Sequence, residues 1–183
     1  KQMNTGSQPV AISTDRIHPD SNPGFVRLSV ANLDQQIAFY QNTIGLQLHW
    51  RESDSAGLGT GLADLLRLTE VQGARRFRGT SGLYHMAFLL PDRRELARVV
   101  RRFFNQRYTN YPTDHILTKS VYLDDLEGNN IEIYTESPED GTFGVENGNI
   151  VARRTNGSLS DGREPMDLDK LFSHLSGEDR LNA

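Results

Sequence analysis

The stretch Leu83-Tyr-His-Met-Ala-Phe-Leu-Leu90 decides the fold, because it repeats a pattern that occurs earlier, at Gly24-Phe-Val-Arg-Leu-Ser-Val30. In both stretches apolar side chains alternate with more polar ones, which is typical of a half-buried β-strand. An amphipathic helix and three further strand-like segments follow each stretch, and such self-similarity indicates two copies of one module. The sequence therefore predicts an α+β fold of two βαβββ modules whose strands form a shared concave mixed sheet.

The expected elements keep the same order in both copies. In the first copy the helix begins at Asn32, whose side chain can cap exposed N–H groups, and Gly45 supplies the turn after it. The expected strands of the first copy then cover residues 46–52, 56–62 and 64–69. In the second copy we expect a helix over residues 91–104 and strands over residues 113–117, 119–123 and 130–134. The segment 124–129 is rich in Asp, Gly and Asn, which favours a tight turn between the last two strands.

Outside the two modules the chain is polar and less regular. We expect residues 1–22 to form a flexible N-terminal arm and residues 23–138 to form the paired domain. Within that domain, module one covers about 23–72 and module two about 82–136. Residues 139–183 are expected to form a C-terminal extension with one short helix after Asp167, which docks on the domain or bridges to a partner.

The composition argues against several classes of protein. The 183 residues carry a formal net charge of −4, which argues against nucleic acid as a partner. No apolar run reaches the roughly 20 residues that cross a bilayer, so we expect no membrane contact through a spanning helix. The chain contains no cysteine for disulfide or thiolate chemistry, and its first residues lack the apolar core of a signal peptide, which favours the cytoplasm.

The strands predict a wall of polar and aromatic side chains. Neighbours in a strand face opposite sides of the sheet, so the apolar alternate residues pack on the helices and the others line the second face. That second face carries Phe25, Arg27, Arg67, His85, Tyr122, Glu132 and Tyr134. Ionisable groups among aromatic rings are typical of a cavity lining, and we expect a small-molecule substrate there.

Some of these side chains have an ordinary structural alternative. Glu132 lies in an apolar strand, where a carboxylate needs a cation, a metal or a hydrogen-bond donor to offset its desolvation. Tyr122 and Tyr134 are either functional or simple packing aromatics. His115 follows Asp114 at the end of a strand, where the pair either orients the imidazole or only decorates a loop. Ordinary polar roles are expected for His18, His49 and His174.

Three segments of the chain resemble the vicinal oxygen chelate superfamily, whose members include glyoxalases, extradiol dioxygenases and antibiotic-resistance proteins. They are Phe39-Tyr-Gln-Asn-Thr-Ile-Gly-Leu46, Leu83-Tyr-His-Met-Ala-Phe-Leu-Leu-Pro91 and Val121-Tyr-Leu-Asp-Asp-Leu-Glu-Gly-Asn-Asn-Ile-Glu-Ile-Tyr134. The resemblance runs from about Gly24 to Pro138 and is closest to the N-terminal half of catechol 2,3-dioxygenase-like proteins. These motifs are specific to the fold but weak for the reaction, because the superfamily hosts many chemistries.

The resemblance implies a metal site. In extradiol members a His from each first strand and a Glu from the last strand of module two hold Fe(II). His85 and Glu132 match the second and third of these ligands, whereas Phe25 stands at the first, and Arg67 stands at a fourth position used in glyoxalase-like members. Two protein ligands hold a divalent ion poorly. We therefore expect either a divalent metal such as Fe²⁺ with a third ligand, for example His115, or a degenerate site in which an Arg67–Glu132 ion pair replaces the metal charge.

The predicted function is that of a small-molecule enzyme, either a dioxygenase- or glyoxalase-like oxidoreductase or a lyase or isomerase. With a metal, His85 and Glu132 would be its ligands, and Tyr122 or His115 would handle substrate protons. Without one, His85 would be the general acid or base in an isomerisation, cyclisation or dehydration of an aromatic or oxygenated substrate.

In that second case Arg27 and Arg67 would hold an enolate or carboxylate, beside Phe25 and Tyr134 in the substrate wall. The alternatives are a non-catalytic small-molecule binding or resistance protein, and an accessory half of a larger assembly. We expect a homodimer, because paired modules of this superfamily often associate.

Overall fold

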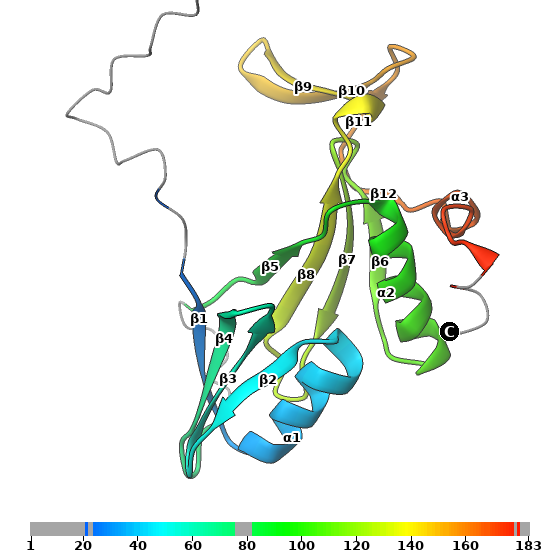
Figure 1. Cartoon of the computed structure of the whole chain (residues 1–183). Coiled ribbons are helices and arrows are strands. Elements are labelled where there is room, and N and C mark those ends of the chain that lie inside the picture. The colour runs from blue at the N-terminus through cyan, green and yellow to red at the C-terminus, as the bar shows by residue number, and fades with distance from the viewer. Residues whose placement is uncertain (1–20, 22–23, 76–81, 178, 180–183) are drawn as a thin grey trace, which may run out of the picture.

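The computed structural model describes residues 21, 24–75, 82–177 and 179, so the arm expected over residues 1–22 lies outside it except for Ser21. Module one contains β1 (Val26–Val30), α1 (Leu33–Phe39), a π-helical segment η1 (Tyr40–Ile44), β2 (Gln47–Arg51), β3 (Ser55–Thr60) and β4 (Ala63–Glu70). Module two contains β5 (Met86–Leu89), α2 (Arg93–Asn105), β6 (Tyr111–Asp114), β7 (Thr118–Asp124) and β8 (Asn130–Glu136). The α+β class and the repeated βαβββ order are confirmed (Figure 1).

Each module forms its own hydrogen-bonded mixed sheet, with strand order β1-β4-β3-β2 in module one and β6-β7-β8-β5 within module two. In both sheets the first strand runs parallel to the last. Val26 pairs with Leu66 in module one, and Met86 pairs with Ile131 in module two. Phe25 and Arg67 therefore stand where His85 and Glu132 stand in the second copy, as the sequence repeat predicts.

The strands differ by up to three residues from their expected bounds, and β6 is displaced by two to three residues toward the N-terminus. The strand expected over residues 113–117 is wrong, because β6 spans Tyr111–Asp114. The side chain of Asp114 accepts the backbone N–H of Ile116 at 2.7 Å, and Ile116 has a φ of 69°. This local turn ends the strand at Asp114 and turns the following residues away from the strand direction.

The two modules share a single hydrophobic core. It contains buried residues of both helices and both sheets, such as Leu33 and Leu66 from module one and Leu96 and Ile131 from module two. A polar contact also joins the modules: Arg102 of α2 donates to the carbonyl oxygen of Ile44 at 2.9 Å. The two modules therefore pack together around this common core.

The two sequence motifs that are most specific to the fold touch each other across the module boundary. The fully buried Tyr40 donates its hydroxyl hydrogen to Oδ2 of Asp125 at 2.9 Å. Glu127, in the same β7–β8 turn, accepts the backbone N–H groups of Ala31 at 2.8 Å and of Asn32 at 3.2 Å. Asn32 itself accepts the N–H of Gln35 at 2.9 Å, which confirms its predicted capping role.

After module two, a short 3₁₀ segment η2 (Pro138–Asp140) leads into the C-terminal part of the chain. It contains β9 (Gly141–Glu146), β10 (Asn149–Arg154), β11 (Leu159–Ser160), β12 (Glu164–Pro165) and α3 (Leu168–Phe172). The β9–β10 hairpin projects beyond the ends of β7 and β8, whereas β12 joins the module-two sheet beside β6 (Figure 1). α3 packs on α2, with the rings of Phe172 and Phe104 6.1 Å apart. None of the described helices is long and apolar enough to cross a membrane.

Candidate functional site

A cavity of about 480 Å³ opens on the face of the module-two sheet that points away from α2. It is lined by Tyr84, His85, Thr113, His115, Tyr122, Asn130 and Arg163. Three of these residues, His85, His115 and Tyr122, are the catalytic candidates that the sequence selects. The structure thus brings those three together, and it adds the cation Arg163 from the C-terminal part of the chain.

Strand alternation aims the side chains into this cavity. On β8, Ile131 and Ile133 are buried toward the helix, whereas Glu132 and Tyr134 are only half-buried on the opposite face. The predicted two-residue alternation is confirmed on this strand. Tyr122 of β7 is the direct cross-strand partner of Glu132, so the phenol and the carboxylate lie on the same face of the sheet.

Three side chains of the cavity, His85, Tyr122 and His115, are connected with Glu132 by a series of polar contacts. Nε2 of His85 lies 3.1 Å from Oε2 of Glu132, and the hydroxyl of Tyr122 donates to Oε1 of the same carboxylate at 2.7 Å. Nε2 of His115 lies 2.9 Å from the Tyr122 hydroxyl oxygen. Nδ1 of His115 lies 2.5 Å from the carbonyl oxygen of Gly162, and it must donate there because a carbonyl oxygen only accepts.

These contacts give Glu132 the partners that a shielded carboxylate needs. Its two oxygens are used by one imidazole and one phenol, which offsets the desolvation expected from the sequence. Burial, and then the hydrogen bond to Glu132, raise the pKa of Tyr122 well above its ordinary value. The phenol therefore stays protonated at neutral pH, and its single hydroxyl hydrogen points to Glu132.

On the module-one face, Arg67 is held by a second carboxylate. Its guanidinium lies 3.8 Å from the centre of the Phe25 ring, and its Nε donates to Asp64 at 2.8 Å. Asp64 also accepts from Nε1 of Trp50 at 2.9 Å and lies 3.0 Å from Nδ1 of His49. The hydrogen bonds from Trp50 and then Arg67 outweigh burial and lower the pKa of Asp64 to about 2.

The expected Arg67–Glu132 ion pair is therefore wrong: Arg67 pairs with Asp64, and Glu132 pairs with His85. The cause is a register shift between β3 and β4, where Leu58 pairs with Leu66 but Gly59 pairs with Asp64. A regular strand would send Asp64 and Arg67, three residues apart, to opposite faces, and the irregularity brings them to the same one. The sequence pattern alone does not reveal this bulge.

The remaining predicted substrate-wall residues lie on the expected strands without polar partners among the described residues. Arg27 is the cross-strand partner of Arg67, and its guanidinium carbon lies 5.9 Å from the centre of the Phe25 ring. Tyr134 is half-buried on β8, opposite Ser120. The η-amino groups of Arg67 also make no hydrogen bond within the described ranges, so this face presents two cations and one carboxylate.

The side chains at the metal positions do not fit a divalent ion. Phe25 has no donor atom, and Arg67 is a permanent cation stacked on it. His85 and Glu132, the two remaining donors, bind each other and Tyr122. In the part of the chain that the structure describes, no three His, Asp or Glu side chains gather as a ligand set, and His115 is engaged by Tyr122 and Gly162. These side chains therefore do not support a chemical step on a bound metal ion.

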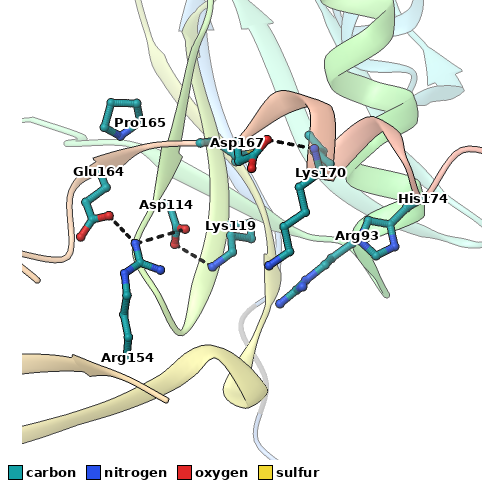
Figure 2. A pocket seen from close by; sticks show the side chains of 11 residues that line it. Arg93, Asp114, Lys119, Arg154, Glu164, Pro165, Asp167, Lys170 and His174 are labelled. Carbon is teal, nitrogen blue, oxygen red and sulfur yellow. Dashed lines mark hydrogen bonds and ion pairs between the residues drawn. The ribbon is translucent and has the colours of Figure 1, made fainter. Parts of the chain in front are cut away.

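A second cavity, of about 300 Å³, lies between module two and the C-terminal part of the chain (Figure 2). Its charged side chains are largely paired with one another. Nζ of Lys119 lies 2.6 Å from Asp114 and 2.7 Å from Asp140, and Arg93 lies 2.8 Å from Asp140. Arg154 approaches Asp114 at 3.8 Å. We call this set of five residues the ionic clasp, because it joins the segment after module two to the module itself.

Sequence reasoning missed Gly162, Arg163 and Asp64. Gly162 lies 47 residues after His115, and Arg163 follows it, in a segment without apolar periodicity. The pairing of β12 with β6 brings them to the cavity. Asp64 stands at the start of a strand, where a carboxylate is unremarkable. Nothing in the sequence pattern signals these three positions.

The comparisons with known proteins agree with this architecture. The model of the Glyoxalase/Bleomycin resistance protein/Dioxygenase superfamily matches residues 23–133, which is more than half of the chain. A catechol-2,3-dioxygenase from Bacillus subtilis (strain 168) is 34% identical over 142 residues, which cover 76% of this chain and 50% of that protein. The chain thus spans about half the length of this curated relative.

Solved structures share the fold at low identity. A lactoylglutathione lyase from Agrobacterium tumefaciens has a TM-score of 0.53 at 23% identity and covers 64% of this chain and 96% of its own. A glyoxalase/dioxygenase from Nostoc punctiforme has a TM-score of 0.56 at 18% identity and covers 68% of this chain and 99% of its own. At these identities the likeness concerns the fold alone.

Proposed function

The chain belongs to the Glyoxalase/Bleomycin resistance protein/Dioxygenase superfamily, and from this premise we propose that its module-two cavity binds a small oxygenated or aromatic molecule and moves a proton on it without a metal. The proposed reaction class is proton transfer, as in an isomerisation, cyclisation or dehydration. His85 is the proposed general base, Tyr122 is the proposed proton donor, and His115 is proposed to position the Tyr122 hydroxyl.

The observation that supports this proposal is the orientation of His85 by Glu132. The carboxylate lies 3.1 Å from Nε2 of the imidazole, which favours the tautomer with the hydrogen on that nitrogen. Nδ1 then carries a lone pair and has no partner among the described residues. A base that a third group orients in this way is a recurrent arrangement in acid–base catalysis.

We propose that Tyr122 returns a proton to the substrate. The raised pKa of Tyr122 keeps its hydroxyl hydrogen in place, and His115 touches the same hydroxyl oxygen at 2.9 Å. When Tyr122 gives its hydrogen to a substrate oxygen or carbon, the protonated His85 can return one through Glu132: its Nε2 hydrogen goes to Oε2, and the carboxyl then reprotonates the Tyr122 oxygen from Oε1. In the proposed cycle, a C–H bond of the substrate breaks, its proton goes to Nδ1 of His85, and Tyr122 protonates the enolate.

Substrate binding by the module-one face is a further part of the proposal. Arg67 is fixed by Asp64 and by the Phe25 ring, so its free η-amino groups are preorganised for an anionic oxygen. Arg27 lies beside it, and Tyr134 offers an aromatic surface on β8. We assign the enolate- or carboxylate-holding role of the two arginines on this basis.

The test is hydrogen exchange on a probe with an acidic C–H group. Phenylpyruvate in D₂O should exchange the hydrogens beside its keto group faster with the protein than without it. His85→Ala should lower the enzymatic exchange by about 100-fold or more, and Tyr122→Phe should lower it as well. His174→Ala is the matched control, because His174 lines the second cavity, together with residues of the ionic clasp. Unchanged exchange in His85→Ala would reject the acid–base role.

A second candidate function is binding without turnover. It is supported by the side chains at the metal positions, where Phe25 has no donor atom and Arg67 is a permanent cation stacked on it. Ligand capture by the wild-type protein, with no exchange above the uncatalysed rate for any keto compound, would favour this candidate. We also propose a homodimer, which light scattering on the purified protein checks directly.

A further inference from the structure

The outer wall of the module-two cavity comes from a segment outside both modules. β12 pairs with β6, with Glu164 opposite Asp114 and Pro165 opposite Thr113. This pairing carries the preceding residues, Gly162 and Arg163, to the edge of the sheet beside His115. The cavity is therefore closed on this side by chain that follows module two by about 25 residues.

The backbone of this segment is locked in place by local hydrogen bonds. Gly162 is buried, has a φ of 70° and donates its N–H to Oγ of Ser160 at 3.0 Å. Arg163 donates its backbone N–H to Oδ1 of Asp161 at 2.9 Å. The carbonyl oxygen of Gly162 accepts from His115 at 2.5 Å. The segment therefore sets the tautomer of His115 and fixes the Cα of Arg163 at the cavity.

The guanidinium of Arg163 has no ion-pair or hydrogen-bond partner among residues 24–75 and 82–177, although it lines the cavity. Glu132, the carboxylate of this site, already uses both oxygens for His85 and Tyr122. Glu164, the next residue in the chain, is engaged by Arg154. Arg163 is an exposed residue, so the cavity presents at its open edge a permanent cation that Glu132 does not neutralise.

We propose that Arg163 binds the carboxylate of a small aromatic acid in the module-two cavity, and this inference rests on the proposed function. A guanidinium recognises a carboxylate through two parallel N–H groups, which suits an unpaired arginine at a cavity wall. The aromatic part follows from the lining, where the rings of Tyr84 and His85 lie 4.8 Å apart and those of His85 and Tyr122 lie 6.1 Å apart. Arg163 acts here as a specificity-determining residue, since it selects anionic over neutral ligands.

The experiment compares benzoate with benzamide, which has the same shape and no charge. Binding is followed by titration calorimetry and by the NMR signals of the histidine rings. The wild-type protein should bind benzoate at least about tenfold more tightly than benzamide. Arg163→Gln should weaken benzoate binding by about tenfold or more and leave benzamide unchanged, whereas Arg163→Lys should restore part of the preference for benzoate.

Arg153→Gln is the matched control, because Arg153 sits on the β10 hairpin and pairs with Glu146 away from the cavity. It should bind benzoate as the wild type does. His85→Ala separates this inference from the proposed function, since it should lose hydrogen exchange and keep the effect of Arg163 on benzoate. Equal benzoate affinity in wild type and Arg163→Gln, or no benzoate binding by the wild type, would overturn the inference even if His85 proves to be the base.

Discussion

Asp64 and Glu132 illustrate how single carboxylates organise the two halves of the protein. Each lies on the polar face of its sheet and accepts hydrogen bonds from an aromatic donor and another side chain. Asp64 forms an ion pair with Arg67, a permanent cation, so the side chains around Asp64 in module one form a fixed cluster. Glu132 contacts the imidazole of His85 and the phenol of Tyr122, and both of these groups can exchange a proton. This arrangement in module two is therefore suited to proton transfer.

At the residue scale, Asp64→Asn should destabilise the protein in a pH-dependent way. The hydrogen bonds lower the pKa of Asp64 to about 2, below its ordinary value of 3.8, so its stabilisation is complete above that ordinary value and disappears as the pH falls toward 2. Urea unfolding should give a loss of about 1–3 kcal/mol for the variant at pH 7, with the gap narrowing below about pH 4. Asp34→Asn, at an exposed ion pair, should change stability by less than about 0.5 kcal/mol. A gap that is independent of pH would contradict this assignment.

The donor set at the metal positions leads to a second prediction at this scale. After reconstitution with iron, manganese, nickel or zinc and desalting, elemental analysis should find less than about a tenth of an equivalent of metal, because, of the four side chains at the metal positions, His85 and Glu132 alone can ligate. One full equivalent, lost in Glu132→Ala, would show that a third ligand completes the site and would favour the dioxygenase alternative.

At the scale of elements, alternation along strands carries most of what the sequence reveals. The burial of Val121 and Leu123 on β7 and of Ile131 and Ile133 on β8 follows from a two-residue period, and so does the face that holds Tyr122 and Glu132. The partners across elements do not follow. Asp64 reaches Arg67 through a strand irregularity, and Arg163 reaches the cavity through a two-residue strand. Both depend on tertiary pairing, which periodicity does not encode.

The contact between η1 and the β7–β8 turn gives the prediction for this scale. Tyr40→Phe should lower the free energy of unfolding by about 1.5–3 kcal/mol, because it removes a buried hydrogen bond to a charged acceptor. Tyr111→Phe is the control: this tyrosine is 64% exposed, and its loss should be nearly neutral. Chemical denaturation of both variants measures the difference, and equal midpoints would mean that the Tyr40–Asp125 bond contributes nothing net.

At the scale of the whole molecule, the C-terminal part of the chain is integrated with module two in three places. β12 extends the sheet, α3 packs on α2, and the ionic clasp ties the segment around Asp140 to β6, β7 and α2. Burial alone would raise the pKa of Asp140, but the hydrogen bonds from Lys119 and Arg93 outweigh it and lower that pKa. The clasp therefore weakens when the solution becomes acidic enough to protonate Asp140.

Asp140→Asn should loosen this part of the chain before it unfolds the modules. The substitution removes one of the two carboxylates that hold the buried ammonium of Lys119, so we expect a loss of about 1–3 kcal/mol and faster tryptic cleavage at Arg153 and Arg154. Glu146→Gln, at an exposed pair on the hairpin, should leave the cleavage rate at Arg154 at the wild-type value. Cleavage of Asp140→Asn at the wild-type rate would show that the clasp does not hold the segment.

The contact of Glu127 with the backbone just before α1 has a consequence for how the chain acquires its structure during synthesis. The carboxylate that accepts the N–H groups of Ala31 and Asn32 lies 96 residues after Ala31 and so leaves the ribosome long after the helix itself. Until then, Tyr40 also lacks its acceptor, and the apolar side of α1 lacks its module-two partners. We therefore expect the nascent first module to wait in a loosely packed state, and both modules to become native in one cooperative step.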